Sequence, residues 1–365
     1  MVLFGENIVA KAELLIKDLK SRAGINIAQA ILRAAKLPTA RSWTELEAII
    51  IQAINKNPAI YDALVAALRV QLVCDMKATS YFSIEPEKKL AVKEALLAAK
   101  IEDTSFSKAF PLSIPVEELQ NDDGVLKAIH SFSDDFGVGV IFSRKRVFSI
   151  SEEYSHEKFT DSMLEQFPNH DKIIAIKNYY HQTFDVVYLN YEYSVLELRA
   201  DITRSDSLLQ TVKQQEKSCT DLRNLTQLFL LNSLKEKVIG APRNLFPLIK
   251  KIYTDPSGAI KKLGFSTVTG SIKTETMKGG VDLRQEPFHL NGAKAINHEM
   301  TLYEVAIIWH RIDIDSVNSK PELYVPGTHM NSVSLEPRCD FAILKGIRSN
   351  CDTNFVLKKM ASFEK

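Results

Sequence analysis

Residues 184–201 read FDVVYLNYEYSVLELRAD, two runs of alternating apolar and polar residues separated by a short polar stretch. Alternation with a period of two is typical of a β-strand that buries one face, and a short polar break between two such runs is typical of a β-hairpin. Period two also places Glu197 and Arg199 on one face of the second strand. The stretch therefore predicts two antiparallel strands with charged residues on one side.

The residues before this hairpin extend the same pattern. FGVGVIF and RVFSIS alternate as strands, and the residues between them, Ser143-Arg144-Lys145, are predicted to form a turn with a basic tip. A short helix around SHEKFTDSMLEQF and a strand at KIIAIKNYY come next. Residues 125–204 are therefore predicted to form an α+β subdomain with the order β-β-α-β-β-β and a largely antiparallel sheet.

Residues 1–103 show a helical pattern throughout, because apolar residues recur at spacings of three and four. Ser42-Trp43-Thr44-Glu45 matches the capping box that starts many helices. We predict an all-helical N-terminal module that docks a partner. A linker is predicted over 104–124, where two prolines and polar turn residues interrupt the helical pattern.

The C-terminal half changes pattern twice. Helical periodicity returns over 205–254, which predicts a helical connector, and strand-like segments dominate 255–365, a β-rich C-terminal subdomain. Within it, 278–300 has no clear period and is predicted to be a long loop. The predicted fold class is α+β: an all-helical N-terminal module, then a largely antiparallel α+β body with two sheet regions separated by a long helix.

Composition gives the class of protein. The chain has 365 residues, 45% hydrophobic and 25% charged, as in ordinary soluble globular proteins, and its net charge of +1 creates no strong field for a polyanion. Cys74, Cys219, Cys339 and Cys351 lack the spacing of a zinc site or a redox pair, which favours free thiols in a reducing compartment. No apolar run has the length of a signal peptide or a membrane span, so we expect a cytoplasmic protein without membrane contact.

The charged face of the opening hairpin has two interpretations. Asp185 with Glu197-Leu198-Arg199 loosely resembles the acidic core of restriction-type nucleases, in which two carboxylates bind a divalent cation such as Mg²⁺. Arg199 would then hold a phosphate, because arginine does not release its proton at accessible pH. The other interpretation is that Glu197 and Arg199 form ordinary cross-strand pairs on an exposed strand face.

Two basic segments are candidates for contact with nucleic acid. A cluster of cations on the predicted hairpin tip can contact a phosphate backbone, and glycines in the predicted loop at 278–300 permit close approach of a ligand. The candidate residues are Arg144, Lys145, Arg146, Lys278, Arg284 and Lys294. No phosphate-binding glycine loop, zinc ligand set or serine nucleophile elbow is present, so no cofactor and no metal is predicted outside the nuclease hypothesis.

These patterns favour a non-enzymatic adaptor or accessory subunit, because no catalytic constellation is complete. We expect the N-terminal helices to bind a protein partner and the basic segments to contact nucleic acid, as in a component of a microbial nucleic-acid or defence system. The alternative is a metal-dependent nuclease that uses Asp185, Glu197 and Arg199 with Mg²⁺. The sequence leaves the oligomeric state open.

Overall fold

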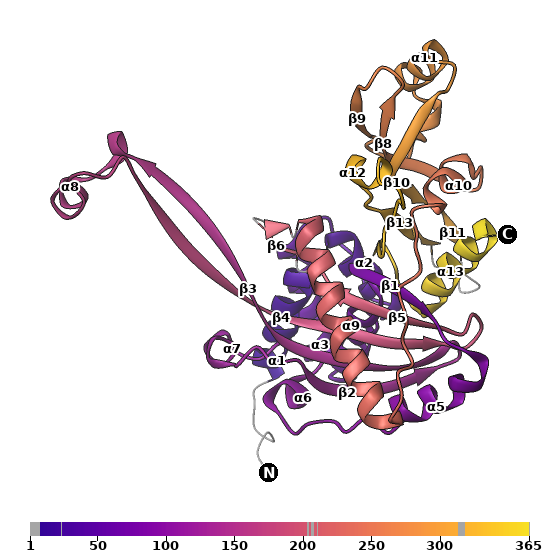
Figure 1. Cartoon of the computed structure of the whole chain (residues 1–365). Helices are drawn as coiled ribbons and strands as arrows, with labels where there is room; N and C mark the ends of the chain where they lie inside the picture. The colour runs from indigo at the N-terminus through magenta and orange to yellow at the C-terminus, as the bar shows by residue number, and fades with distance from the viewer. Residues whose placement is uncertain are drawn as a thin grey trace.

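The computed structural model describes residues 8–22, 24–202, 204–205, 208–209, 211–312 and 318–364. Within these residues, ten strands form one sheet in which all neighbouring strands are antiparallel (Figure 1). In spatial order the sheet contains β2 (Lys127–Asp134), β3 (Gly137–Ser155), β4 (Lys172–Asn190), β5 (Val195–Asp201), β1 (Lys77–Ser83), β14 (Ala342–Lys345), β13 (Glu322–Val325), β10 (Met300–Ile308), β8 (Ala259–Thr267) and β9 (Ile272–Thr276).

The two strand-rich regions of the chain meet in the middle of this sheet. β1 pairs on one side with β5 and on the other with β14, from near the end of the chain. A mixed fold with a large antiparallel sheet is thus confirmed. The two regions do not form separate sheets, because three residue pairs between β1 and β14 connect them.

Helices cover both faces of the first half of the sheet (Figure 1). One face packs against an N-terminal helical layer, and its core contains Val186 and Tyr188. The other face packs against two further helices around Val187 and Leu198. The first layer contains α1 (Ile8–Arg22), α2 (Ile25–Ala34), α3 (Trp43–Lys56) and α4 (Ala59–Cys74), and the second contains α5 (Pro86–Leu97) and α9 (Val212–Leu234). Ser42 caps α3 by accepting a hydrogen bond from the Glu45 amide, which is one of the two contacts of the predicted capping box.

The prediction that residues 1–103 are helical throughout is wrong at β1. This strand, KATSYFS, has six consecutive buried residues because helices cover both of its faces. A strand buried on both sides shows no alternation of apolar and polar residues, so its periodicity gives no signal. The N-terminal helices therefore flank a central strand of the sheet, and their apolar residues join its core.

The remaining elements are short or lie at the edges. The predicted linker contains two helices, and residues predicted as a loop at 278–300 contain a 3-10 turn and a helix. No helix in the described ranges is long and apolar enough to cross a membrane. These elements are α6 (Ser105–Ala109), α7 (Val116–Asn121), η1 (His156–Lys158), α8 (Asp161–Gln166), β6 (Arg204–Ser205), β7 (Leu208–Leu209), α10 (Leu248–Thr254), η2 (Leu283–Gln285), α11 (Pro287–Ala295), β11 (Arg311–Ile312), β12 (Asn318–Ser319), α12 (His329–Ser332) and α13 (Asn350–Glu364).

Candidate functional site

The most distinctive feature of the fold is a two-stranded ribbon that projects from the body (Figure 1). β3 and β4 pair along all nineteen residues of each strand. β2 pairs with β3 only as far as Ser143, and β5 pairs with β4 only from Val186 onward. Residues 147–180 therefore leave the sheet as a hairpin with η1 and α8 at its end, and we call this segment the arm.

The arm exposes apolar side chains on one of its faces. Residues that pair across antiparallel strands share a face, and the pairs Ser151–Ile176 and Glu153–Ile174 lie on the same face as Val147. Val147, Ile174 and Ile176 are 47%, 51% and 67% exposed, and we call these three residues the arm stripe. The same face of the sheet is covered by the N-terminal helical layer in the body, so the stripe begins where that cover ends.

The arm is acidic. Residues 147–180 contain six Asp and Glu residues and three Lys residues, which gives a net charge of −3 with His neutral. The acidic residues are Glu152, Glu153, Glu157, Asp161, Glu165 and Asp171. This segment consequently repels a phosphate backbone and favours a basic surface.

Polar contacts fix the arm root, residues 143–146 and 181–184, to the body. The Arg22 guanidinium donates to the Gln182 carbonyl at 2.7 Å and lies 4.4 Å from the centre of the Phe184 ring. The Gln182 side chain accepts from the Ile114 amide at 2.8 Å and donates to the Ser143 hydroxyl at 3.1 Å. The last residue of α1, the segment between α6 and α7, and strand β3 thus hold one residue of β4 in place.

Beneath these contacts, Asp201 lies in a buried cluster of charges. Its carboxylate accepts from Lys77 at 2.7 Å and from the Phe184 amide at 2.9 Å, and Arg22 lies 3.4 Å away. Burial alone would raise the pKa of Asp201, but Lys77 and Arg22 hold that pKa below its ordinary range. Lys77 is fully buried and also donates to the Phe184 carbonyl at 2.7 Å. Asp201 is therefore a charged link between β5, β1 and the arm root.

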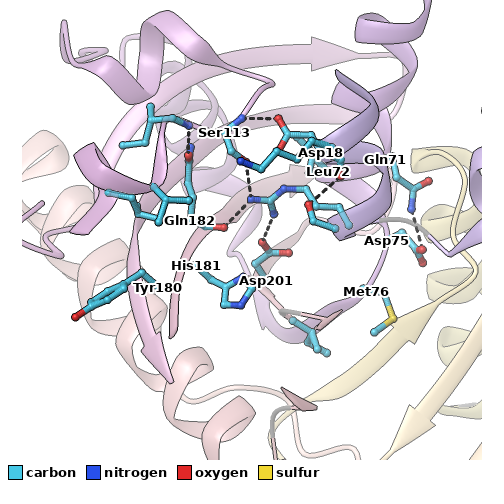
Figure 2. A pocket seen from close by; sticks show the side chains of 17 residues that line it. Asp18, Gln71, Leu72, Asp75, Met76, Ser113, Tyr180, His181, Gln182 and Asp201 are labelled. Atoms are coloured by element: carbon cyan, nitrogen blue, oxygen red, sulfur yellow. Dashed lines mark hydrogen bonds and ion pairs between the residues drawn. The ribbon is translucent and has the colours of Figure 1, made fainter. Parts of the chain in front are cut away.

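A cavity of about 200 Å³ lies beside this cluster (Figure 2). Its polar wall includes Asp18, which accepts from the Ser113 amide at 2.7 Å, and Asp75, whose pKa is raised by burial. His181 from the arm root also lines it, and burial and the nearby Arg22 lower the pKa of its imidazole. No three His, Cys, Asp or Glu side chains gather to hold a metal ion anywhere in the described part of the chain.

The structure does not bring Asp185 and Glu197 together. Val186 pairs with Arg199 and Tyr188 with Glu197, so Glu197 and Arg199 share the face of the sheet toward the N-terminal helices. Asp185, one residue before Val186, points to the opposite face. There its carboxylate accepts from the Asp201 amide at 2.7 Å and lies 3.4 Å from Arg146. The two carboxylates that a shared cation would require are separated by the sheet.

Glu197 and Arg199 form a buried ion pair rather than an exposed one. Both side chains are fully buried, and their atoms Nε and Oε2 lie 3.1 Å apart. Arg199 also donates to the Asn350 side chain at 2.7 Å and stacks 4.5 Å from the Tyr188 ring centre. Burial raises the pKa of Glu197, an effect that Arg199 only partly offsets. The predicted shared face is correct, whereas the predicted exposure of that face is wrong because α4 and α13 cover it.

The basic cluster is not a hairpin tip, because β3 continues through it as a regular strand. Arg144 pairs with Asp221 of α9 at 3.2 Å, and Arg146 donates to the Asp201 carbonyl at 2.7 Å as well as facing Asp185. Lys145 donates to the backbone carbonyls of Gln120 and Asp122, at the end of α7. These three cations serve contacts within the protein.

The other predicted basic residues are spread along the far end of the sheet. Arg284 donates to the carbonyls of Tyr253, Asp255 and Gly258 and pairs with Asp282 at 2.7 Å, so it fastens η2 to the loop before β8. Lys278 and Lys294 are exposed. The predicted basic loop is therefore a structured segment with one internal and two solvent-facing cations.

No family model, curated protein or solved structure matches this chain. The site must therefore be interpreted from its geometry alone. Sequence reasoning missed Lys77, Arg22 and Asn350, which partner the predicted strand residues from distant segments. One sequence feature could have indicated such a partner. Lys77 is a charged residue directly before the apolar-rich segment ATSYF, between two helices.

Proposed function

We propose that this protein is a non-enzymatic adaptor that binds a protein partner through the arm. The observation that carries the proposal is the arm stripe, an apolar face on a projecting ribbon that leaves the sheet where the helical layer ends. A two-stranded ribbon is marginally stable in water unless its apolar face packs against something. A partner that covers the stripe would bury this face along the arm, as the N-terminal helical layer buries it in the body.

The fixed root supports this proposal. A docking element binds more tightly when it is already held in its bound orientation, because less conformational freedom is lost on binding. Arg22, Gln182 and Asp201 hold the arm root through hydrogen bonds to groups on other elements. In this proposal the buried charges therefore orient the arm and perform no chemistry.

The docking element differs from the one expected on the N-terminal helices. The apolar faces of α1–α4 pack into the core with the sheet, so less of their apolar surface is available to a partner. We do not extend the proposal to the nuclease, because Asp185 and Glu197 point to opposite faces. Nor do we extend it to nucleic acid, since the arm is acidic and Arg144, Lys145 and Arg146 bind groups of the protein itself.

A photo-crosslinking amino acid at position 176 tests the proposal. Ile176 is 67% exposed on the arm stripe, and Leu90 on α5 is 62% exposed and serves as the matched control position. We expect irradiation of the full chain in its native cells to give one dominant protein adduct from position 176 and none of comparable yield from position 90.

The adduct must also depend on the stripe. Changing Val147 and Ile174 to Ser in the position-176 chain should abolish it, because the contact surface is then polar. Equal, diffuse labelling from positions 176 and 90 would contradict the proposed docking role. Mass spectrometry of the adduct identifies the partner chain.

A further inference from the structure

We infer that the partner on the arm is a second copy of this chain, with the arm of each copy lying along the body of the other. This inference rests on the proposed function, since it identifies the occupant of the arm stripe. It follows from the charge of the arm, from the area of its exposed face and from two-fold symmetry.

The charges of the arm and the body are complementary. The arm carries a net charge of −3, and the whole chain carries +1, so the rest of the chain carries +4. A contact between arm and body therefore brings together parts of the chain with opposite net charge. Packing two arms along each other would bring two acidic segments together, which is unfavourable. Charge thus favours a contact between the arm of one copy and the body of another.

The dimensions of the arm suit an interface of this kind. Nine residues in each strand beyond the root span about 30 Å at about 3.3 Å per residue, and two strands are about 10 Å wide. One face of the ribbon therefore offers about 300 Å². If two copies exchange arms, both arms and both receiving surfaces are buried, about 1,200 Å² in total, which reaches the range of specific interfaces.

Two-fold symmetry makes the arrangement complete. Each copy contributes one arm and receives one, so a closed dimer leaves neither stripe exposed and forms no filament. A second copy is present whenever the chain is made, so it is always available to cover an apolar face whose exposure to water is unfavourable. A different protein would have to be supplied in matching amount to give the same cover.

Sedimentation equilibrium of the full chain between about 1 and 100 µM tests the inference, with the range chosen to bracket dimers of micromolar affinity. We expect a monomer–dimer equilibrium that weakens at high salt, because screening reduces the attraction between arm and body. The variant Ile174→Ser/Ile176→Ser should dimerise at least tenfold more weakly. Leu90→Ser/Leu97→Ser, which removes two exposed leucines of α5, is the matched control and should dimerise like the wild type.

A charge variant gives a second, independent readout. Glu152→Lys/Glu153→Lys reverses two charges of the arm without changing the stripe, and it should also weaken the dimer. Circular dichroism and the urea midpoint check that the variants fold, which is expected because the arm changes lie outside the body and both leucines of the control are exposed.

Two results would overturn the inference. A chain that remains monomeric throughout this range has no second copy on its arm, and the arm could still bind the protein that cross-links at position 176. A dimer that is equally tight in the stripe variant shows that the copies associate elsewhere. The proposed function fails only if position 176 gives no dominant adduct that depends on the stripe, so the two failures are distinguishable.

Discussion

Replacing Asp201 by Ala is expected to lower the free energy of unfolding by about 3–5 kcal/mol, because removal of one partner leaves a buried charge uncompensated. The charge left behind is Lys77, which is fully buried and pairs with Asp201 at 2.7 Å. The Phe184 amide and the Arg22 guanidinium lose an acceptor in the same change. Urea unfolding at pH 7 measures the effect.

Asp103 supplies the control for this prediction. It pairs with Lys108 at 3.0 Å, but both side chains are more than half exposed, so Asp103→Ala removes an ion pair that water screens. Exposed pairs of this kind contribute about 0–1 kcal/mol. If Asp201→Ala costs no more than Asp103→Ala, Asp201 does not hold β1, β5 and the arm root together.

The contribution of Asp201 to the free energy of unfolding depends on pH, and the lowered pKa of Asp201 gives the sign of this dependence. A carboxyl group whose pKa is lower in the folded than in the unfolded state stabilises the fold above its ordinary pKa of about 3.9. This contribution is lost as the pH falls through the folded-state value. The stability difference between wild type and Asp201→Ala should therefore shrink below about pH 4, and a constant difference would contradict the charged state assigned to Asp201.

Replacing Glu197 by Leu is expected to destabilise the protein by about 3–5 kcal/mol, because the buried Arg199 then lacks its partner. Arginine keeps its proton at any accessible pH, so the unpaired charge cannot be relieved by deprotonation. The double variant Glu197→Leu/Arg199→Met removes both charges and keeps apolar volume. It should therefore be more stable than Glu197→Leu alone.

This comparison tests whether the unpaired buried charge of Arg199 is the source of the destabilisation. If the double variant unfolds at the same or lower urea concentration than Glu197→Leu, charge burial is not the source of the cost. Arg199 also donates to the Val73 carbonyl and to the Asn350 side chain, so the double variant, which loses these contacts, is still expected to be less stable than the wild type.

Parts of the fold follow from local pattern and parts do not. Period-two alternation correctly gave β5 and the shared face of Glu197 and Arg199, but it predicted two strands, KIIAIKNYY and the first run of the hairpin, where the structure has the single strand β4. It gave no sign that this face is buried, because the covering groups come from segments as distant as Asn350. Burial of a strand face is decided by tertiary packing, which local periodicity does not contain.

The sequence pattern did not predict the full length of β3 for a related reason. A run of three cations is typical of a turn, but Arg144 and Arg146 face Asp221 and Asp185. These acidic partners allow the strand to continue, and they lie 39 or more residues away in the chain. The same limit applies to the stripe, since alternation predicts its strands without showing that nothing in the body covers them.

If the arm stripe is a binding surface, polar substitutions in it should weaken binding of the partner, and this affinity can be measured. The protein that cross-links at position 176, whichever chain it is, is titrated against wild type, against Val147→Ser/Ile174→Ser/Ile176→Ser and against the control Leu90→Ser/Leu97→Ser. We expect the stripe variant to bind at least about tenfold more weakly, a loss of about 1.4 kcal/mol or more, while the control binds like wild type. Equal affinity of the stripe variant and the wild type would contradict the binding role of the stripe.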